Sequence, residues 1–213
     1  LRSAKEIIEL YDTKFLTSDE LKAYSEQVLK ILSKSDERKD DTKGLTTEDL
    51  EDEEKELLND EIVLEEEVQV ALSEIFGQLF KTHKEMNNSL IEHITKNLLP
   101  KTLADNASET MNKFGIILID DMVEYLGYGI IEQLWPNFFT IFEKFCIHKN
   151  IAVRQAACYG LGVYATNTPP AAFIPFIEKS IKILIQSADI PKGNESEKNY
   201  GNCKDNAVSS FGK

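Results

Sequence analysis

The segment Val153–Ala165, VRQAACYGLGVYA, decides the fold class because its glycines permit two incompatible structures. Gly160, Gly162 and Ala165 fit the G-x-G-x-x-A fingerprint of a dinucleotide-binding turn. In such a turn the first glycine ends a β-strand, whereas the residues before it here, AVRQAAC, are mostly good helix formers. The segment therefore predicts a helix without a cofactor. Its small residues predict a slim helical surface that a neighbouring helix approaches closely.

Helical periodicity continues on both sides of this segment, and strand-like alternation is nearly absent. Leu64, Val68, Leu72, Ile75 and Leu79 share one face of a helix. Pro100 is expected to end the helix before it, and an Asn106–Glu109 capping pair is expected to open the next. The expected helices cover residues 3–11, 18–34, 64 onward, 89–99, 106–125, 131–147, 151–166 and 171–188.

The helices repeat as pairs. The small residues Ala71, Gly115, Ala157 and Ala207 are each followed four positions later by an apolar residue, at intervals of about 40–50 residues. Two-helix units of this period are typical of HEAT or armadillo arrays, in which neighbouring pairs stack to bury their apolar faces. The predicted fold is an all-α solenoid of stacked antiparallel helix pairs. Its predicted parts are a partial HEAT repeat (1–34), an acidic, mobile inserted loop (35–59), HEAT repeats 60–100, 101–148 and 149–190, and a loop with the start of a further truncated repeat (191–213).

Charge is concentrated in one part of the chain. The net charge is −13, and the span Asp36–Glu67 holds 16 Asp and Glu against four Lys and Arg. A direct nucleic-acid partner requires the opposite sign. The loop 35–59 has too few apolar residues to fold on its own. It serves either as a solvated spacer or as a device that attracts basic partners through long-range electrostatics.

The sequence shows no pattern of catalysis, metal binding or membrane insertion. No apolar run approaches the length of a transmembrane helix, and the first residues, LRSAKEIIELY, do not have a signal-peptide pattern. Its ends stop within helical patterns, so we expect a piece of a longer protein. The three cysteines and three histidines lack metal-ligand spacing, and two of the thiols are expected to be buried and inert. Adjacent Asp120 and Asp121 point about 100° apart on a helix and do not converge on one proton. We therefore predict neither an enzyme nor a cofactor.

The segments LIDDMVEYLG, HKNIAVRQAACYGLGVYA, KILIQSAD and DNAVSSFGK resemble HEAT repeats of the karyopherin-β nuclear transport receptors, most closely the importin beta-3 (karyopherin beta-3) subclass. The resemblance is continuous over residues 57–213, and residues 1–56 fit by helix pattern alone. It implies a right-handed superhelix from a later part of the array, with first helices outside and second helices inside. It also implies shuttling between cytoplasm and nucleus, basic cargo, release by Ran-GTP acting on the full-length receptor, and Phe-Gly nucleoporins as partners. A structural HEAT scaffold, such as a phosphatase scaffold subunit, is the alternative.

Within this resemblance, acidic side chains are the candidates for contact with basic cargo. They are Asp49, Glu51, Asp52, Glu53 and Glu54 in the acidic loop and Glu92, Glu132 and Glu178 on second helices.

Two further features leave alternatives open. The aromatic residues Trp135, Phe138, Phe139, Phe142 and Phe145 are spaced as a core face, with a groove for a partner's aromatic side chains as the alternative. Asn150 stands where typical HEAT units have the Asp that pairs with Arg154. An Asn can still cap the helix.

Overall fold

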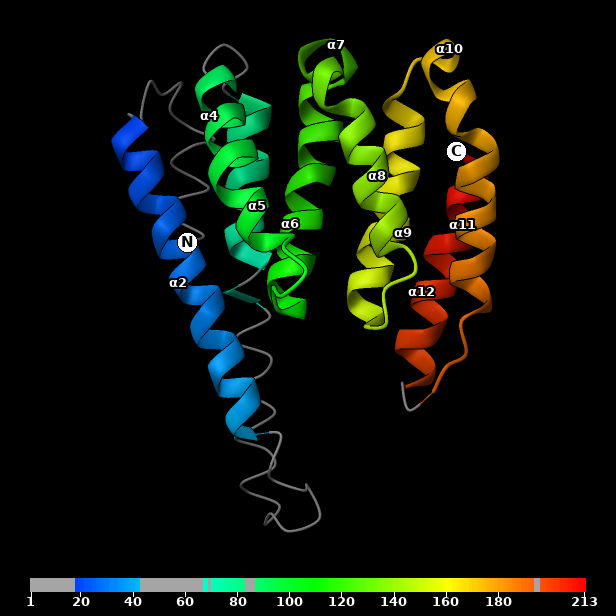
Figure 1. Cartoon of the computed structure of the whole chain (residues 1–213), viewed down its shortest axis with the longest axis horizontal. Coiled ribbons are helices and arrows are strands. Elements are labelled where there is room, and N and C mark those ends of the chain that lie inside the picture. The colour runs from blue at the N-terminus through cyan, green and yellow to red at the C-terminus, as the bar shows by residue number, and fades with distance from the viewer. Residues whose placement is uncertain (1–17, 43–66, 69, 83–86, 194–195) are drawn as a thin grey trace. The chain divides into compact units, whose positions relative to one another are not determined.

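A computed structural model describes residues 18–42, 67–68, 70–82, 87–193 and 196–213, and all regular elements in these ranges are helices (Figure 1). The predicted all-α class is therefore confirmed. None of the described helices is both long and apolar enough to traverse a lipid bilayer. The chain divides into two compact units, Leu1–Phe114 and Gly115–Lys213.

The first unit packs its helices around aromatic and aliphatic side chains. Its elements are α2 (Ser18–Thr42), a helix over residues 70–82, α4 (Asn87–His93), the π-helical turn η2 (Ile94–Leu98), α5 (Leu99–Thr102) and the start of α6 (Glu109–Asp121). The Phe76 ring lies 5.4 Å from the Tyr24 ring of α2 and 6.1 Å from the Phe114 ring of α6. One central side chain thus joins three helices. The helix α2 reaches Thr42, so residues 35–42, expected in the acidic loop, are helical.

Pro100 does not end its helix, contrary to the expectation. The chain stays helical through Thr102 because the π-helical turn η2 comes first, in which the Leu99 amide bonds the Ile94 carbonyl. Pro100 then occupies the first turn of α5, where a proline, which has no N–H, removes no hydrogen bond.

The helix α6 is capped by Ser108 rather than by Asn106. The Ser108 hydroxyl accepts the Met111 amide at 3.1 Å, and its carbonyl accepts the Asn112 amide at 2.9 Å. The side-chain amide of Asn112 in turn donates to the Thr102 carbonyl at 3.0 Å. The expected capping pair was therefore two residues out of register, and the buried Asn112 ties the loop to α6.

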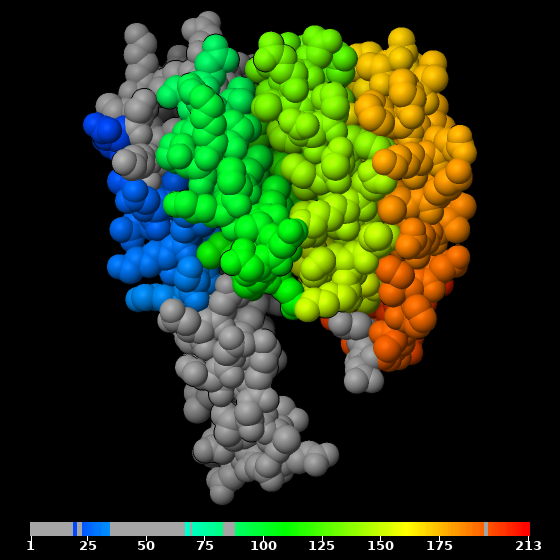
Figure 2. Space-filling model, viewed as in Figure 1, coloured from blue at the N-terminus to red at the C-terminus, as the bar shows by residue number. Residues whose placement is uncertain are grey.

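The second unit is a stack of helix pairs. It contains the rest of α6, the π-helical turn η3 (Met122–Leu126), α7 (Tyr128–Ile131), η4 (Glu132–Leu134), α8 (Trp135–Phe145), α9 (Ile151–Asn167), α10 (Pro170–Phe173), η5 (Ile174–Phe176), α11 (Ile177–Asp189), α12 (Glu197–Ser209) and η6 (Ser210–Gly212). The helix α9 packs against α8, α12 and η3, and α11 packs against α12. Figure 2 shows α8 and α11 covering one face of this unit. The unit therefore consists of a row of first helices (α6, α9, α12) and a row of second helices (α8, α11).

The glycines of VRQAACYGLGVYA allow close helix packing, as predicted. A Cβ atom on Gly160 would lie 2.3 Å from Cε1 of Phe142 on α8, and one on Gly162 would lie 2.6 Å from the Ser210 hydroxyl. Both glycines are buried inside α9, and no strand precedes them. The Ser210 hydroxyl donates to the Cys158 carbonyl at 2.9 Å across the gap that Gly162 leaves open.

The aromatic residues of α8 form the core of the second unit. Trp135, Phe138, Phe139, Phe142 and Phe145 are all buried, which confirms core packing and leaves no aromatic groove. The Trp135 indole stacks on Tyr164 at 5.0 Å between ring centroids, and its N–H donates to the Thr168 hydroxyl at 2.7 Å. The three cysteines are also buried and free of disulfides.

Asn150 caps α9, as the sequence allowed. Its Oδ1 accepts the amides of Ala152 and Val153 at 2.9 and 3.1 Å. Arg154, which is 2% exposed, donates to the carbonyls of His148 and Lys149. Carbonyls of the loop after α8 thus take the place of the aspartate found in typical HEAT units.

Replacing Asn150 with alanine should lower the free energy of unfolding by about 1 kcal/mol, because two amides of the first turn of α9 lose their acceptor. Urea titration of the 213-residue chain followed by circular dichroism measures the change. Asn150→Asp keeps the acceptor and should retain the stability. Equal losses in the two variants would contradict the cap.

Candidate binding pocket between second helices

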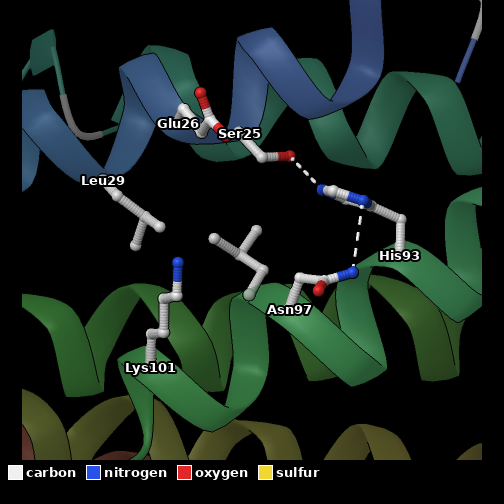
Figure 3. Close-up of a pocket in the computed structure, with 7 residues that line it drawn as sticks. Ser25, Glu26, Leu29, His93, Asn97 and Lys101 are labelled. Atoms are coloured by element: carbon white, nitrogen blue, oxygen red, sulfur yellow. Dashed lines mark hydrogen bonds between the residues drawn. The ribbon is translucent and has the colours of Figure 1, made fainter. Parts of the chain in front are cut away.

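A cavity of about 320 Å³ opens in the first unit between α2 and the continuous helix α4–η2–α5 (Figure 3). A volume of this size suits one side chain of a partner rather than a large ligand. Its lining residues are Ser25, Glu26 and Leu29 of α2 and His93, Asn97, Leu98 and Lys101 of the helix α4–η2–α5.

Hydrogen bonds fix one wall of the pocket. The Asn97 amide nitrogen lies 3.4 Å from His93 Nδ1, and His93 Nε2 lies 2.9 Å from the Ser25 hydroxyl. An amide NH₂ donates to Nδ1, so the neutral imidazole carries its proton on Nε2 and donates to Ser25. The chain of bonds joins the two helices at this end of the pocket (Figure 3).

The other end of the pocket combines apolar side chains with one ammonium group. Figure 3 shows Lys101 extending from α5 toward α2, beside Leu29. Among the seven described residues that line the pocket, Lys101 forms no ion pair with Glu26. An ammonium and an amide above aliphatic side chains suit a group that accepts hydrogen bonds, such as a carboxylate or an amide carbonyl. The pocket by itself therefore does not select a lysine or an arginine.

The carboxylates predicted to contact cargo are not gathered at this pocket. Glu92 on α4 pairs with Lys96 at 2.6 Å, and the hydrogen bond from Lys96 lowers the pKa of the Glu92 carboxyl. In the second unit, Glu178 pairs with Lys182 at 2.5 Å, and Glu132 accepts the Tyr128 hydroxyl at 3.1 Å. All three are exposed. The acidic-loop candidates Asp49, Glu51, Asp52, Glu53 and Glu54 lie outside the described residues.

Sequence reasoning missed every lining residue of the pocket. Ser25 and His93 are 68 positions apart, and neither belongs to a motif. The signal that could have located the pocket was the predicted stacking of helix pairs. The helices 18–34 and 89–99 were expected in successive repeats, 1–34 and 60–100, and the stacking of repeats brings facing side chains together.

Comparisons with known proteins place these observations in a family context. Residues 1–100 match the family model Importin repeat 6, which covers slightly less than half of the chain. They include residues 1–56, which the sequence resemblance covered only by helix pattern. The importin repeat belongs to transport receptors rather than to enzymes. The search of curated proteins found no match.

A solved structure has the same fold. It is the karyopherin Kap121p, crystallised with the SUMO protease Ulp1p, and it matches 99% of this chain with a TM-score of 0.62 and 20% sequence identity. The match spans 19% of the Kap121p chain. Residues 1–100 thus match an importin-repeat model, and the chain has the fold of this karyopherin HEAT solenoid.

Proposed function

We propose that this chain is a segment of a nuclear import receptor, most like importin beta-3, that contacts cargo with its second helices. The observation that carries the proposal is the importin-repeat match over residues 1–100, the region that holds six of the seven pocket residues. The karyopherin fold supports it, and Kap121p, which shares that fold, was crystallised with a protein partner. The receptor shuttles between cytoplasm and nucleus, meets Phe-Gly nucleoporins on the way, and releases its cargo to Ran-GTP.

Two kinds of group contribute to cargo contact in this proposal. The pocket between α2 and α4–α5 takes an acceptor-bearing side chain from an extended cargo segment. The exposed carboxylates of Glu92, Glu132 and Glu178, together with those of the acidic loop, attract the basic residues of the same segment. Glu92 and Glu178 already pair with lysines on their own helices, so each adds little alone.

The intact receptor tests the proposal directly. It should retain basic cargo proteins in a pull-down, and Ran loaded with GTP should release them, whereas Ran loaded with GDP should not. A structural scaffold of the phosphatase kind would hold its partners equally in both conditions. Retention that is insensitive to GTP-loaded Ran would therefore favour the scaffold.

Reversing the charge of Lys101 should weaken cargo binding about tenfold, which corresponds to about 1.4 kcal/mol, because the pocket loses its ammonium donor. Fluorescence anisotropy of a labelled cargo segment with the intact receptor measures the affinity. Lys81→Glu makes the same charge change at an exposed position on the helix over residues 70–82, outside the pocket lining, and is the matched control. Equal losses in Lys101→Glu and Lys81→Glu would point to long-range electrostatics and reject the pocket as a contact site.

A further inference from the structure

The pocket between α2 and α4–η2–α5 has an open rim of polar groups above a closed floor. The side chains of Glu26, Asn97 and Lys101 are exposed, whereas Ser25 and Leu98 are buried. A side chain that enters from solvent therefore meets the rim groups first. The charges and hydrogen bonds of this rim decide between the two acceptor groups that suit the pocket, a carboxylate and an amide carbonyl.

The ammonium group of Lys101 is available to a ligand. Among the described residues it forms no ion pair or hydrogen bond, and the carboxyl group of Glu26 points away from it (Figure 3). Lys96 on the same helix differs, because it pairs with Glu92 at 2.6 Å. An ammonium group bonds a carboxylate through a charge-assisted hydrogen bond, which is about twice as strong as a neutral one. A carboxylate is therefore a better occupant than an amide carbonyl.

A second donor lies one helical turn from Lys101. The Asn97 amide nitrogen lies 3.4 Å from His93 Nδ1, and His93 Nε2 lies 2.9 Å from the Ser25 hydroxyl, so a chain of bonds that reaches α2 holds the amide. An amide NH₂ carries two hydrogens, and the bond to His93 uses one of them. Residues four positions apart are neighbours on a helix surface. The other hydrogen of Asn97 and the Lys101 ammonium can thus each bond one oxygen of the same carboxylate.

The apolar part of the lining favours glutamate over aspartate. Leu29 and Leu98 line the cavity, whose volume of about 320 Å³ suits one side chain. Glutamate has two methylene groups that these leucines can shield from water, and aspartate has one.

We propose, as a refinement of the import function above and resting on it, that the pocket recognises one glutamate side chain within an otherwise basic cargo segment. The carboxylate bonds Lys101 and Asn97, and its methylene groups pack on Leu29 and Leu98. A lysine or arginine beside the glutamate pairs with the exposed carboxylate of Glu26. The pocket then selects a glutamate flanked by basic residues rather than basic charge alone.

Nuclear magnetic resonance titration of the 213-residue chain with two peptides separates this recognition from general electrostatic attraction. The peptides are acetyl-Lys-Gly-Glu-Gly-Lys-amide and its glutamine analogue, acetyl-Lys-Gly-Gln-Gly-Lys-amide, which is the more positively charged of the two. The net charge of the chain is −13, so general attraction favours the glutamine peptide. The pocket predicts the opposite order. The glutamate peptide should bind about fivefold more tightly, the upper end for an exposed ion pair, with saturable shifts of the amides at Ser25, Asn97 and Lys101.

Three variants locate the preference. Lys101→Met removes the ammonium group, keeps an unbranched side chain and should remove the preference for glutamate. Lys81→Met is the matched control, at an exposed position outside the pocket lining, and should retain the preference. Glu26→Gln should weaken the binding of both peptides to the same degree, because both carry the flanking lysines.

Two results would overturn the proposal. One is equal or tighter binding of the glutamine peptide to the original chain, and the other is a preference for glutamate that survives in Lys101→Met. Either result would leave the release of cargo by GTP-loaded Ran from the intact receptor unaffected, so the pull-down tests the import function separately. Failure of the pull-down would in turn leave the peptide preference of the 213-residue chain unchanged.

Discussion

Gly160→Val should lower the free energy of unfolding of the chain by about 3 kcal/mol, because the added side chain overpacks the core. The first atom of the new side chain would lie 2.3 Å from Cε1 of Phe142, a distance at which one group must move. Phe142 is fully buried among the aromatic rings of the core and has little room to yield. Urea unfolding followed by circular dichroism, with the tryptophan fluorescence of Trp135 as a second probe, measures the loss.

The chain contains a matched control for this substitution. Gly201 lies within α12, and a Cβ atom there would meet nothing within 4 Å. Gly201→Ala should therefore raise the free energy of unfolding by about 0.5–1 kcal/mol, because alanine loses less backbone entropy than glycine in a helix. If Gly160→Val were tolerated as well as Gly201→Ala, close packing would not explain the glycines of α9.

The stability of the chain should fall as the pH rises from about 4 to 8, and Asp120→Asn should remove most of this fall. In the unfolded chain an aspartate ionises near its ordinary pKa of about 4, whereas the pKa of the native Asp120 carboxyl is about 8. Between these values the native state holds a proton that the unfolded state has released. The stabilisation is therefore complete below the unfolded pKa and is lost as the pH rises through the native pKa.

The expected size of this effect is large. Each pH unit between the two pKa values corresponds to about 1.4 kcal/mol, so even half of the interval gives about 3 kcal/mol. Urea unfolding at pH 5 and pH 8.5 measures the difference in the original chain, in Asp120→Asn and in the exposed control Asp205→Asn. Parallel pH profiles for all three would show that Asp120 ionises normally in the native state.

Local pattern was sufficient for the described helices and for the close approach of α8 to α9, whereas the helix expected over residues 3–11 lies outside the described residues. The glycines of VRQAACYGLGVYA were assigned to helix packing because helix formers precede them, and Gly160 does face Phe142. The helix cap at Asn150 could likewise be predicted from the residue type and its position before the helix. Local rules failed at Pro100, where a π-helical turn accommodates the missing N–H, and at Asn106, where Ser108 is the cap. In both cases a backbone amide bonds an acceptor a few residues from the one that the local rule predicts.

The sequence by itself determined that this protein is a series of paired helices with one apolar face each, because helical periodicity and small residues are properties of neighbouring positions. Only the tertiary structure decided which polar groups meet. His93 reaches Ser25 across 68 residues of chain, and the buried Oδ1 of Asp120 has no hydrogen-bond partner. Whether a buried polar group has a partner depends on the stacking of distant helices, and that stacking is set by the fit of the whole apolar face rather than by the polar residues themselves.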